Sequence, residues 1–346
     1  MRDIHTIDLP TRVVVGRKVI EKVGETCREL GLRGRVLVLS GPHTQTRAGR
    51  RVITSLEEEG FEPNLLRVEG EPLEEVEEEI RRTRPSFLVG VGGGRVIDLA
   101  KYSSSRARLP FLSVPTAASH DGIASSRASL RRLGPLSVDA RTPLAILADV
   151  EVISRSPHRL TASGCGDLMA KFTAVRDWRL SHLLTGEYYG DYSAQLALMS
   201  AEVTARNSKL IGEGKEEGVR VVVEALISCG VAMCIAGSSR PCSGSEHSFA
   251  HALEEVSPNP SLHGERCGVG TILMAYLHGM NWKRVRRVLS EVGAPTTAEE
   301  LGVEGEAVVE AMLRAREIRP ERFTILNRKK LNKEMARRIA EKTGVV

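Results

Sequence analysis

The sequence lacks any obvious pairing of its cysteines, and this absence argues against a disulfide-stabilised protein. Among 346 residues there are six cysteines, and none of them forms a CxxC pair or a spacing typical of a disulfide framework: Cys27, Cys165, Cys229, Cys234, Cys242 and Cys267. We therefore expect buried thiols in a protein from a reducing compartment, and we do not expect a zinc site built from thiolates.

Long apolar runs are also missing. No segment approaches the roughly 18 uninterrupted apolar residues that are typical of a transmembrane helix. Residues 1–16 carry charges and lack the apolar core that a secretory signal peptide needs. We therefore expect a cytoplasmic protein without a transmembrane segment.

The composition gives no indication of a surface for nucleic acid. Aromatic residues make up only 4% of the chain, and Lys and Arg are scattered among Asp and Glu to give a net charge of +5. A nucleic-acid interface would gather basic and aromatic side chains on one face. The modest positive excess suits an anionic cofactor and a small anionic substrate. The length and the hydrophobic content of 41% suffice for two domains, each with its own core.

The first half of the sequence alternates regularly between short β-type runs and helix-type patterns. The expected strands are 11–15, 35–39, 64–68, 87–91 and 111–114, and the expected helices between them are 19–30, 46–59, 71–82 and 96–104. Shorter β-like pieces follow in 127–149. The alternation predicts an α/β fold, a parallel sheet with helices on both faces.

The character of the sequence changes after Asp149. Strand signals almost vanish, and long helical patterns are expected over 160–184, 189–207, 219–235, 245–255 and 268–277. We therefore predict an α/β nucleotide-binding domain over residues 1–152 and an all-α helical bundle over residues 153–346.

Three histidines in one short stretch of the helical half are the strongest indication of chemistry. His247 and His251 are four residues apart, so they share a face if this segment is a helix. His263 follows a loop of Ser, Pro and Asn that could return it to that face. Neutral imidazoles suit zinc, and a catalytic zinc takes three protein ligands and keeps one position open. The alternative is a helix with two surface histidines and a third histidine in a loop.

A glycine triplet marks a candidate phosphate-binding turn. Gly92, Gly93 and Gly94 directly follow an expected strand and open a helical pattern. Glycines at such a turn let the backbone approach a phosphate, and the helix N-terminus supplies free N–H groups. The pattern is not G-x-G-x-x-G and it follows several β-α units, which disfavours a plain Rossmann dehydrogenase. A tight structural turn is the alternative.

A second loop with room for a ligand, PTAASHDGIAS at residues 115–125, follows the next expected strand. Thr116, Ser119 and Ser125 can donate hydrogen bonds, and Asp121 can accept one from a substrate hydroxyl. An ordinary polar loop with turn chemistry is an equal alternative.

Four segments, in this order and spacing, together resemble one enzyme family. The glycine triplet, PTAASHDGIAS, GCGDLMAK and SEHSFAHAL with a following HGE are similar to the archaeal-type sn-glycerol-1-phosphate dehydrogenases, within the wider superfamily of glycerol dehydrogenase, iron-alcohol dehydrogenase and dehydroquinate synthase. The resemblance covers most of the chain. It implies an N-terminal nucleotide-binding domain, a C-terminal helical domain and an active site in the cleft between them.

The resemblance also implies a zinc ion, one per subunit, held by one aspartate and two histidines. The matching positions here are Asp167, His247 and His263. His251 is thereby moved from the metal to the substrate, which it would contact together with Asp121 and Asp167. These three residues are the expected catalytic and substrate-binding set, with His251 as proton relay or orienting group and zinc as Lewis acid.

By the same resemblance, the phosphates of NAD(P) lie on the glycine turn and on the second loop. The expected cofactor-binding residues are Gly92, Gly93, Gly94, Arg95, Val96, Ile97, Asp98, Thr116, Ala117, Ala118, Ser119 and Ser125. The expected strand 35–39 ends in Ser40-Gly41 and not in an acidic residue, which makes NADP as well as NAD an expected cofactor.

The implied reaction is the reversible reduction of dihydroxyacetone phosphate to sn-glycerol 1-phosphate for ether-lipid synthesis, carried out by an expected homo-oligomer. Lys171, Arg127 and Lys209 are the candidates for binding the substrate phosphate. The alternatives are a zinc-dependent glycerol or polyol dehydrogenase without phosphate specificity, a dehydroquinate synthase, and a non-catalytic nucleotide-binding regulator. The sequence does not fix the choice between NAD and NADP.

Overall fold

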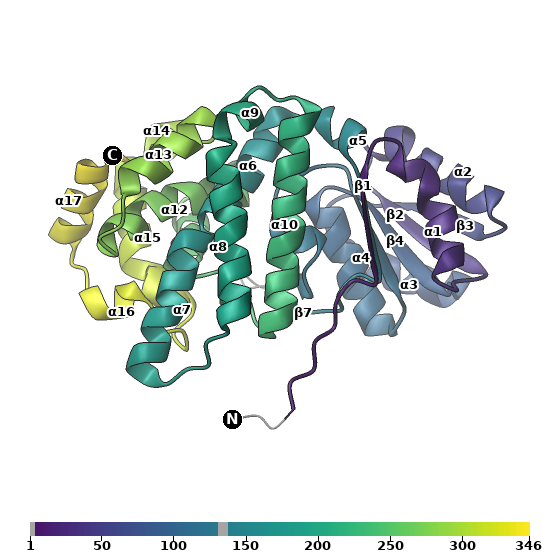
Figure 1. The fold of residues 1–346 in the computed structure, drawn as a ribbon, viewed down its shortest axis with the longest axis horizontal. Helices are drawn as coiled ribbons and strands as arrows, with labels where there is room; N and C mark the ends of the chain where they lie inside the picture. Colours follow the sequence, from purple (N-terminus) through teal and green to yellow (C-terminus); the bar gives the residue numbers. More distant parts are fainter. Residues whose placement is uncertain (1–3, 131–137) are drawn as a thin grey trace. The chain divides into compact units, whose positions relative to one another are not determined.

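The computed structural model describes residues 4–130 and 138–346 and divides into two compact units, Met1–Pro157 and His158–Val346. The first unit is α/β and the second is helical (Figure 1), which confirms the predicted fold class. Helix α5 (Val150–Ser154) contacts strands of the first unit. The division into functional domains at residues 152 and 153 stays a prediction.

The first unit is built on a six-stranded sheet in the order β1-β8-β5-β4-β2-β3, in which every neighbouring pair is parallel. The strands are β1 Arg12–Gly16, β2 Arg35–Ser40, β3 Glu62–Arg67, β4 Phe87–Gly92, β5 Phe111–Pro115 and β8 Ala145–Asp149. Two short strands, β6 Arg127–Ala128 and β7 Val138–Asp139, form a separate antiparallel pair.

Helices cover both faces of this sheet (Figure 1). They are η1 Val19–Lys22, α1 Val23–Glu29, η2 Gln45–Gly49, α2 Arg50–Glu58, α3 Leu73–Thr83, α4 Gly94–Ala107 and η3 Asp121–Ile123, followed by α5. Val36 and Val38 of β2 belong to one core with α1 and α2, whereas Leu37 and Leu39 belong to a second core with α3 and α4. Burial on both faces explains why this strand is apolar throughout.

The strand order creates a switch point at the carboxyl ends of β2 and β4. These strands are neighbours, but α2 lies on one face of the sheet and α4 on the other. The Thr44 hydroxyl connects the two strand ends, since it donates to the carbonyl of Val91 at 3.3 Å and lies 2.9 Å from the Ser40 hydroxyl. Open α/β sheets bind their ligands at such a point, so the fold places the glycine turn at the position expected of a cofactor site.

The second unit consists of helices. They are α6 His158–Met169, α7 Lys171–Thr185, α8 Asp191–Arg206, α9 Ser208–Gly212, α10 Glu216–Ala236, α11 Ser245–Val256, α12 His263–Leu277, α13 Trp282–Glu291, α14 Ala298–Leu301, α15 Gly305–Ile318, α16 Ile325–Lys329 and α17 Lys333–Thr343.

Two of the helices expected from the sequence differ from those in the structure. The single helix expected over 160–184 is two, because the backbone tightens at Ala170, whose carbonyl accepts from the amide of Thr173 at 3.1 Å. Helix α12 begins at His263 and not at 268, so this histidine lies at the start of a helix.

One helix among the described residues, α10, has the length and apolar composition that a membrane span would need. Of its most apolar window, 67% is buried inside the structure. It packs on α8, α6 and α9, which is the behaviour of a core helix.

Helices α6 and α12 approach each other closely at two glycines. A Cβ atom on Gly166 would overlap the carbonyl oxygen of Gly264, and a Cβ atom on Gly264 would overlap the carbonyl oxygen of Ser163. Each glycine is directly adjacent to a predicted metal ligand, Asp167 on α6 and His263 on α12. The close approach of the two backbones therefore brings these two ligands together.

We expect Gly264→Ala to lower the free energy of unfolding by about 1–3 kcal/mol or more, because the added methyl group meets backbone atoms that cannot move away cheaply. Gly268→Ala, one turn later on the same helix, is the milder comparison. Its Cβ would lie 3.2 Å from the flexible end of Leu289 and 3.3 Å from the Cα atom of Gly166, whereas that of Gly264→Ala would overlap a carbonyl oxygen. Urea unfolding followed by circular dichroism measures both. Equal midpoints for the two variants would contradict the role of the glycine pair.

Candidate active site

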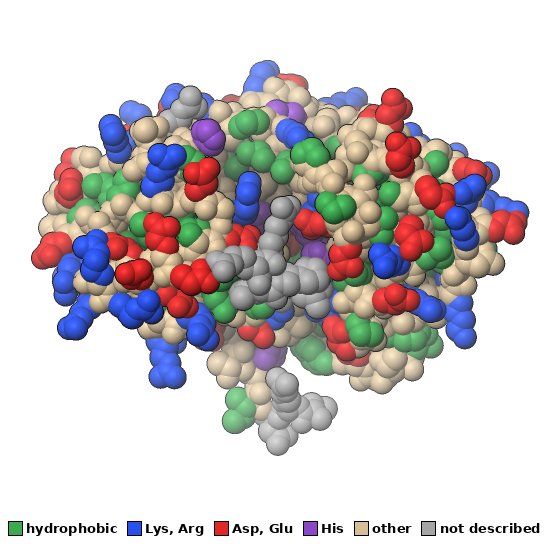
Figure 2. Space-filling model, turned by 180° about the vertical axis from the view of Figure 1, so that it is seen from behind, with side chains coloured by type: hydrophobic (Ala, Val, Ile, Leu, Met, Phe, Trp, Pro, Cys, Tyr) green, Lys and Arg blue, Asp and Glu red, His purple; other side chains and the backbone are tan. Residues whose placement is uncertain are grey.

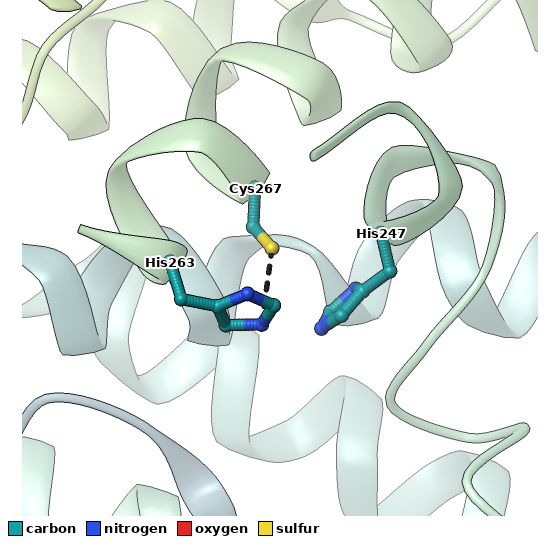
Figure 3. A group of neighbouring side chains, drawn as sticks. All are labelled: His247, His263 and Cys267. Carbon is teal, nitrogen blue, oxygen red and sulfur yellow. Dashed lines mark hydrogen bonds between the residues drawn. The ribbon is translucent and has the colours of Figure 1, made fainter. Parts of the chain in front are cut away.

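The three histidines of the second unit lie together. His247 and His251 are on α11, and His263 is the first residue of α12. The ring centroid of His263 lies 5.1 Å from that of His247 and 5.6 Å from that of His251. Figure 3 shows the rings of His247 and His263 facing a common space from two different helices.

Asp167 joins this group from a distant part of the sequence. Its Oδ1 atom lies 3.4 Å from Nε2 of His247, and its side chain is almost completely buried. Asp167 and His263 are also close enough for their charges to interact. The structure therefore brings the three predicted ligands to one place, with His251 beside them.

Glu246, which the sequence reasoning missed, fixes the orientation of His247. Nδ1 of His247 lies 2.8 Å from Oε1 of this buried carboxylate, so Nδ1–H donates and Nε2 is left facing Asp167. Thr173 and the amide of Gly244 also donate to Glu246, at 2.7 and 2.6 Å. Burial opposes the charge on Glu246, but the hydrogen bond from His247 and these others outweigh it and lower its pKa. A carboxylate behind a histidine is the usual outer partner of a metal ligand.

Lys171 keeps Asp167 ionised. Nζ of Lys171, which is fully buried, lies 2.8 Å from Oδ1 of Asp167 and 3.4 Å from the carbonyl of Cys242. Burial alone would raise the pKa of Asp167, but the Lys171 ammonium and the hydrogen bond from His247 hold it well below its usual value.

The surroundings of His247 and His263 shift their pKa values in opposite directions. Burial disfavours a proton on either ring, but Cys267, Asp167 and Glu246 together raise the pKa of His247 well above its usual value. Burial and the charges of His247 and His251 lower the pKa of His263 well below it. A place that attracts a proton between two carboxylates also attracts a metal cation, which competes with that proton.

Cys267 is a further neighbour that the sequence reasoning did not connect with the site. Its Sγ atom lies 3.5 Å from Nε2 of His263, one helical turn away, and one donor atom from each of His247, His263 and Cys267 lies within 4.8 Å of the others (Figure 3). The spacing of four residues between His263 and Cys267 was the available signal. Burial raises the pKa of this thiol, so Cys267 is a poorer metal ligand at neutral pH than the ionised Asp167.

This donor set fits zinc. Two imidazoles and a carboxylate, with one position left open, form a known type of catalytic zinc site, and a thiol beside them is also compatible with zinc. Hard cations such as Mg²⁺ would prefer a site made of oxygen atoms.

In the first unit, the glycine turn and the loop that begins at Thr116 are neighbours. Gly92 pairs with Pro115 across β4 and β5, and the amide of Thr116 donates to the carbonyl of Gly92 at 2.9 Å. Gly93 has a φ of −76° and its missing Cβ would point into open space, whereas a Cβ on Gly94 would overlap the ring of His120. The space beside Gly93, at the N-terminus of α4, suits a phosphate.

The other predicted cofactor residues divide into two kinds. Asp98 and Ser125 are buried and already bonded: Asp98 accepts from Lys101 at 2.9 Å and from the amide of Ser129 at 3.0 Å, and the Ser125 hydroxyl contacts the backbone of Arg127. They hold the loop after β5 against α4. Arg95 is exposed, Val96 and Ser119 are half-buried, and the rest are buried: Ile97, Thr116, Ala117 and Ala118. Asp121, which was predicted to bind the substrate, is half-buried.

Comparison with solved structures shows which known proteins share this fold. Glycerol dehydrogenase from Schizosaccharomyces pombe has the same fold, with a TM-score of 0.81 at 21% identity, covering 98% of this chain and 90% of that one. NADH-dependent butanol dehydrogenase A from Thermotoga maritima matches with a TM-score of 0.73 at 18% identity and covers 98% of both chains. A family model described as iron-containing alcohol dehydrogenase matches residues 14–157. The fold is that of this dehydrogenase superfamily.

Sequence comparison is more specific. Glycerol-1-phosphate dehydrogenase [NAD(P)+] from Aeropyrum pernix is 52% identical over 347 residues, covering 99% of both chains. The protein of the same name from Methanosarcina mazei is 50% identical over 344 residues, covering 98% of this chain and 96% of its own. The chain belongs to the glycerol-1-phosphate dehydrogenase family, as the sequence motifs predicted.

We expect Glu246→Gln to weaken zinc binding by about 10- to 100-fold, because the amide no longer fixes the tautomer and basicity of His247. Glu255→Gln, an exposed position on the same helix, is the matched control and should bind zinc as the wild type does. Competition against a chromogenic chelator gives the affinities. The same measurement on Asp167→Asn and Cys267→Ala identifies the third ligand: loss of zinc in the cysteine variant alone would assign that place to Cys267.

We expect Gly93→Ala to fold normally but to bind NADPH about 10- to 100-fold more weakly, since its methyl group enters the space that we assign to a phosphate. Fluorescence titration with NADH and NADPH, together with a thermal melt, tests this. Unchanged affinity for both cofactors would make the triplet a structural turn only.

Proposed function

We propose that the protein is a zinc-dependent and NAD(P)-dependent sn-glycerol-1-phosphate dehydrogenase, which reversibly reduces dihydroxyacetone phosphate and thereby supplies the glycerol backbone of ether lipids. The observation that carries this proposal is the convergence of Asp167, His247 and His263, with His251 beside them, in one buried site. Relatives at about half identity over nearly the whole chain bear the same activity in their names, which supports the substrate and the cofactor.

In this proposal Asp167, His247 and His263 hold the zinc ion, and Glu246 holds His247. A bound zinc ion supplies Lewis acidity toward a carbonyl oxygen, and NAD(P)H supplies the hydride. Lys171 keeps the Asp167 carboxylate ionised and fixes its position by the bond of 2.8 Å. His251 and Asp121 bind the substrate and orient its hydroxyl group.

The cofactor occupies the first unit in this proposal. The free amides at the start of α4, next to Gly93, bind its phosphates, and the loop from Thr116 to Ser119 lies beside them. No acidic side chain ends β2, where Ser40 stands, so the 2′-phosphate of NADP is not repelled there.

The test is an assay of NADH and NADPH oxidation with dihydroxyacetone phosphate, followed by determination of the chirality of the product. We expect turnover with both cofactors and sn-glycerol 1-phosphate as the product. Comparable kcat/KM values for dihydroxyacetone and for its phosphate would instead indicate a polyol dehydrogenase. Cofactor binding without any turnover would indicate a nucleotide-binding regulator.

We further expect His247→Ala and His263→Ala to lose zinc and at least about 100-fold in kcat/KM, because several kcal/mol of charge stabilisation disappear. His251→Ala should keep its zinc and lose about 10- to 100-fold through a lost hydrogen bond to the substrate. Zinc content by mass spectrometry and steady-state kinetics measure both effects. Full zinc content and full activity in the first two variants would show that the ligand assignment is wrong.

A further inference from the structure

Three arginine side chains from different segments gather around His251 in the second unit. Arg266 lies on α12, Arg319 directly follows α15, and Arg322 lies in the turn before α16. Arg266 and Arg319 are buried and Arg322 is half-buried. The pKa of His251 is lowered to about 3. Burial is the largest cause, and the positive charges of Arg319, His247 and the other two arginines add to it. Burial and the positive charges of the arginines therefore both disfavour a proton on this imidazole.

Hydrogen bonds fix two of these arginines against α11 and the turn before it. Arg322 donates to the carbonyl of Ser243 at 3.1 Å and to the hydroxyl of Ser239 at 2.8 Å. Arg266 donates to the carbonyl of Ser261 at 2.7 Å and to the carboxylate of Glu254, three residues beyond His251, at 2.9 Å. Helix α15, which Arg319 follows, packs along α11. The cluster is therefore held in place by its surroundings.

Two buried polar atoms beside this cluster lack a hydrogen-bond partner among the described residues. One is the hydroxyl of Ser243, whose backbone carbonyl already accepts from Arg322, and the other is Nε of Arg266. A buried donor without a partner destabilises the folded state. An anion with several oxygen atoms can accept hydrogen bonds from such donors.

We propose that Arg319, Arg322 and the hydroxyl of Ser243, with Arg266 beside them, form the subsite that binds the phosphate group of the substrate. This rests on the proposed function. In dihydroxyacetone phosphate the phosphate is carried by the carbon next to the carbonyl, so its binding residues must adjoin those that bind the carbonyl. The cluster meets this requirement because Arg266 is bonded to Glu254 on the helix of His251 and Arg322 is bonded to Ser243 just before that helix, while the ring of His251 lies beside that of His263.

Two of the three candidates named from the sequence are paired with carboxylates, and the third is exposed. Lys171 is bonded to Asp167, Arg127 forms an ion pair with Asp139 in the first unit, and Lys209 is exposed on α9. A phosphate of the cofactor offers the same chemistry as that of the substrate. The cluster belongs to the unit of the predicted metal ligands, and Arg266 stands three residues after His263 on α12, which favours the substrate.

The experiment compares Arg319→Gln, Arg322→Gln and Ser243→Ala with Arg328→Gln, a control at an exposed position of α16. We expect kcat/KM for dihydroxyacetone phosphate to fall by about 10- to 100-fold for each arginine variant and by less for the serine variant. Turnover of dihydroxyacetone, zinc content and the affinities for NADH and NADPH should stay within about threefold of the wild type. Inorganic phosphate, which should compete with the substrate in the wild type, should compete more weakly.

Three results would overturn the inference. Equal losses with dihydroxyacetone and with its phosphate would make the cluster structural, and a loss confined to NADPH affinity would assign it to the cofactor. Unchanged kinetics in folded variants would show that the phosphate binds elsewhere. If the glutamine variants do not fold, Arg319→Lys replaces them in the same assays, because it keeps the charge but not the planar guanidinium group. Failure of the proposed function looks different, because the wild type itself would then not prefer dihydroxyacetone phosphate to dihydroxyacetone.

Discussion

The close approach of α6 and α12 is the constraint on which the site of the second unit depends. Glycine on both helices removes the side chains that would separate them, at Gly166 and Gly264. The next residue on one helix is Asp167, and the residue before the glycine on the other is His263. Two donors that are almost a hundred positions apart in the sequence are thereby held together by backbone packing, with no need for long side chains that would have to be ordered.

Buried charges give this site its character. Asp167 with Lys171, and His247 with Glu246, place ionised groups inside a bundle whose other interior positions are largely apolar. Such groups are costly to bury singly and are acceptable only when each has its hydrogen bonds. Glu246 illustrates this, since it accepts from His247, Thr173 and the amide of Gly244. The result is a set of buried donor groups held by hydrogen bonds, next to the arginines that we propose as an anion-binding subsite.

The sequence predicted much of this arrangement because periodicity reports burial directly. The apolar runs of β2 and β4 indicated strands buried on both faces, and the strand order then brought the glycine turn and Thr116 together. The family motifs named Asp167 and His263, which the structure places beside His247. Glu246 was missed because a single carboxylate carries no pattern of its own, and Cys267 was missed because its spacing of four residues from His263 was not connected with the site. The sequence also indicated that basic residues are scattered among acidic ones. Figure 2 shows both kinds of charged side chain mixed over the visible face.

By itself, the sequence determined the order of secondary structure, the change from α/β to helical architecture after Asp149, and the family. These depend on local preference and on motifs, which can be read one segment at a time. Only the tertiary structure decided which charged groups face one another: that Glu246 fixes His247, that Cys267 adjoins His263, and that Arg266, Arg319 and Arg322 gather around His251. The physical reason is that an ion pair or a binding subsite depends on distances between segments far apart in the chain, which packing alone sets.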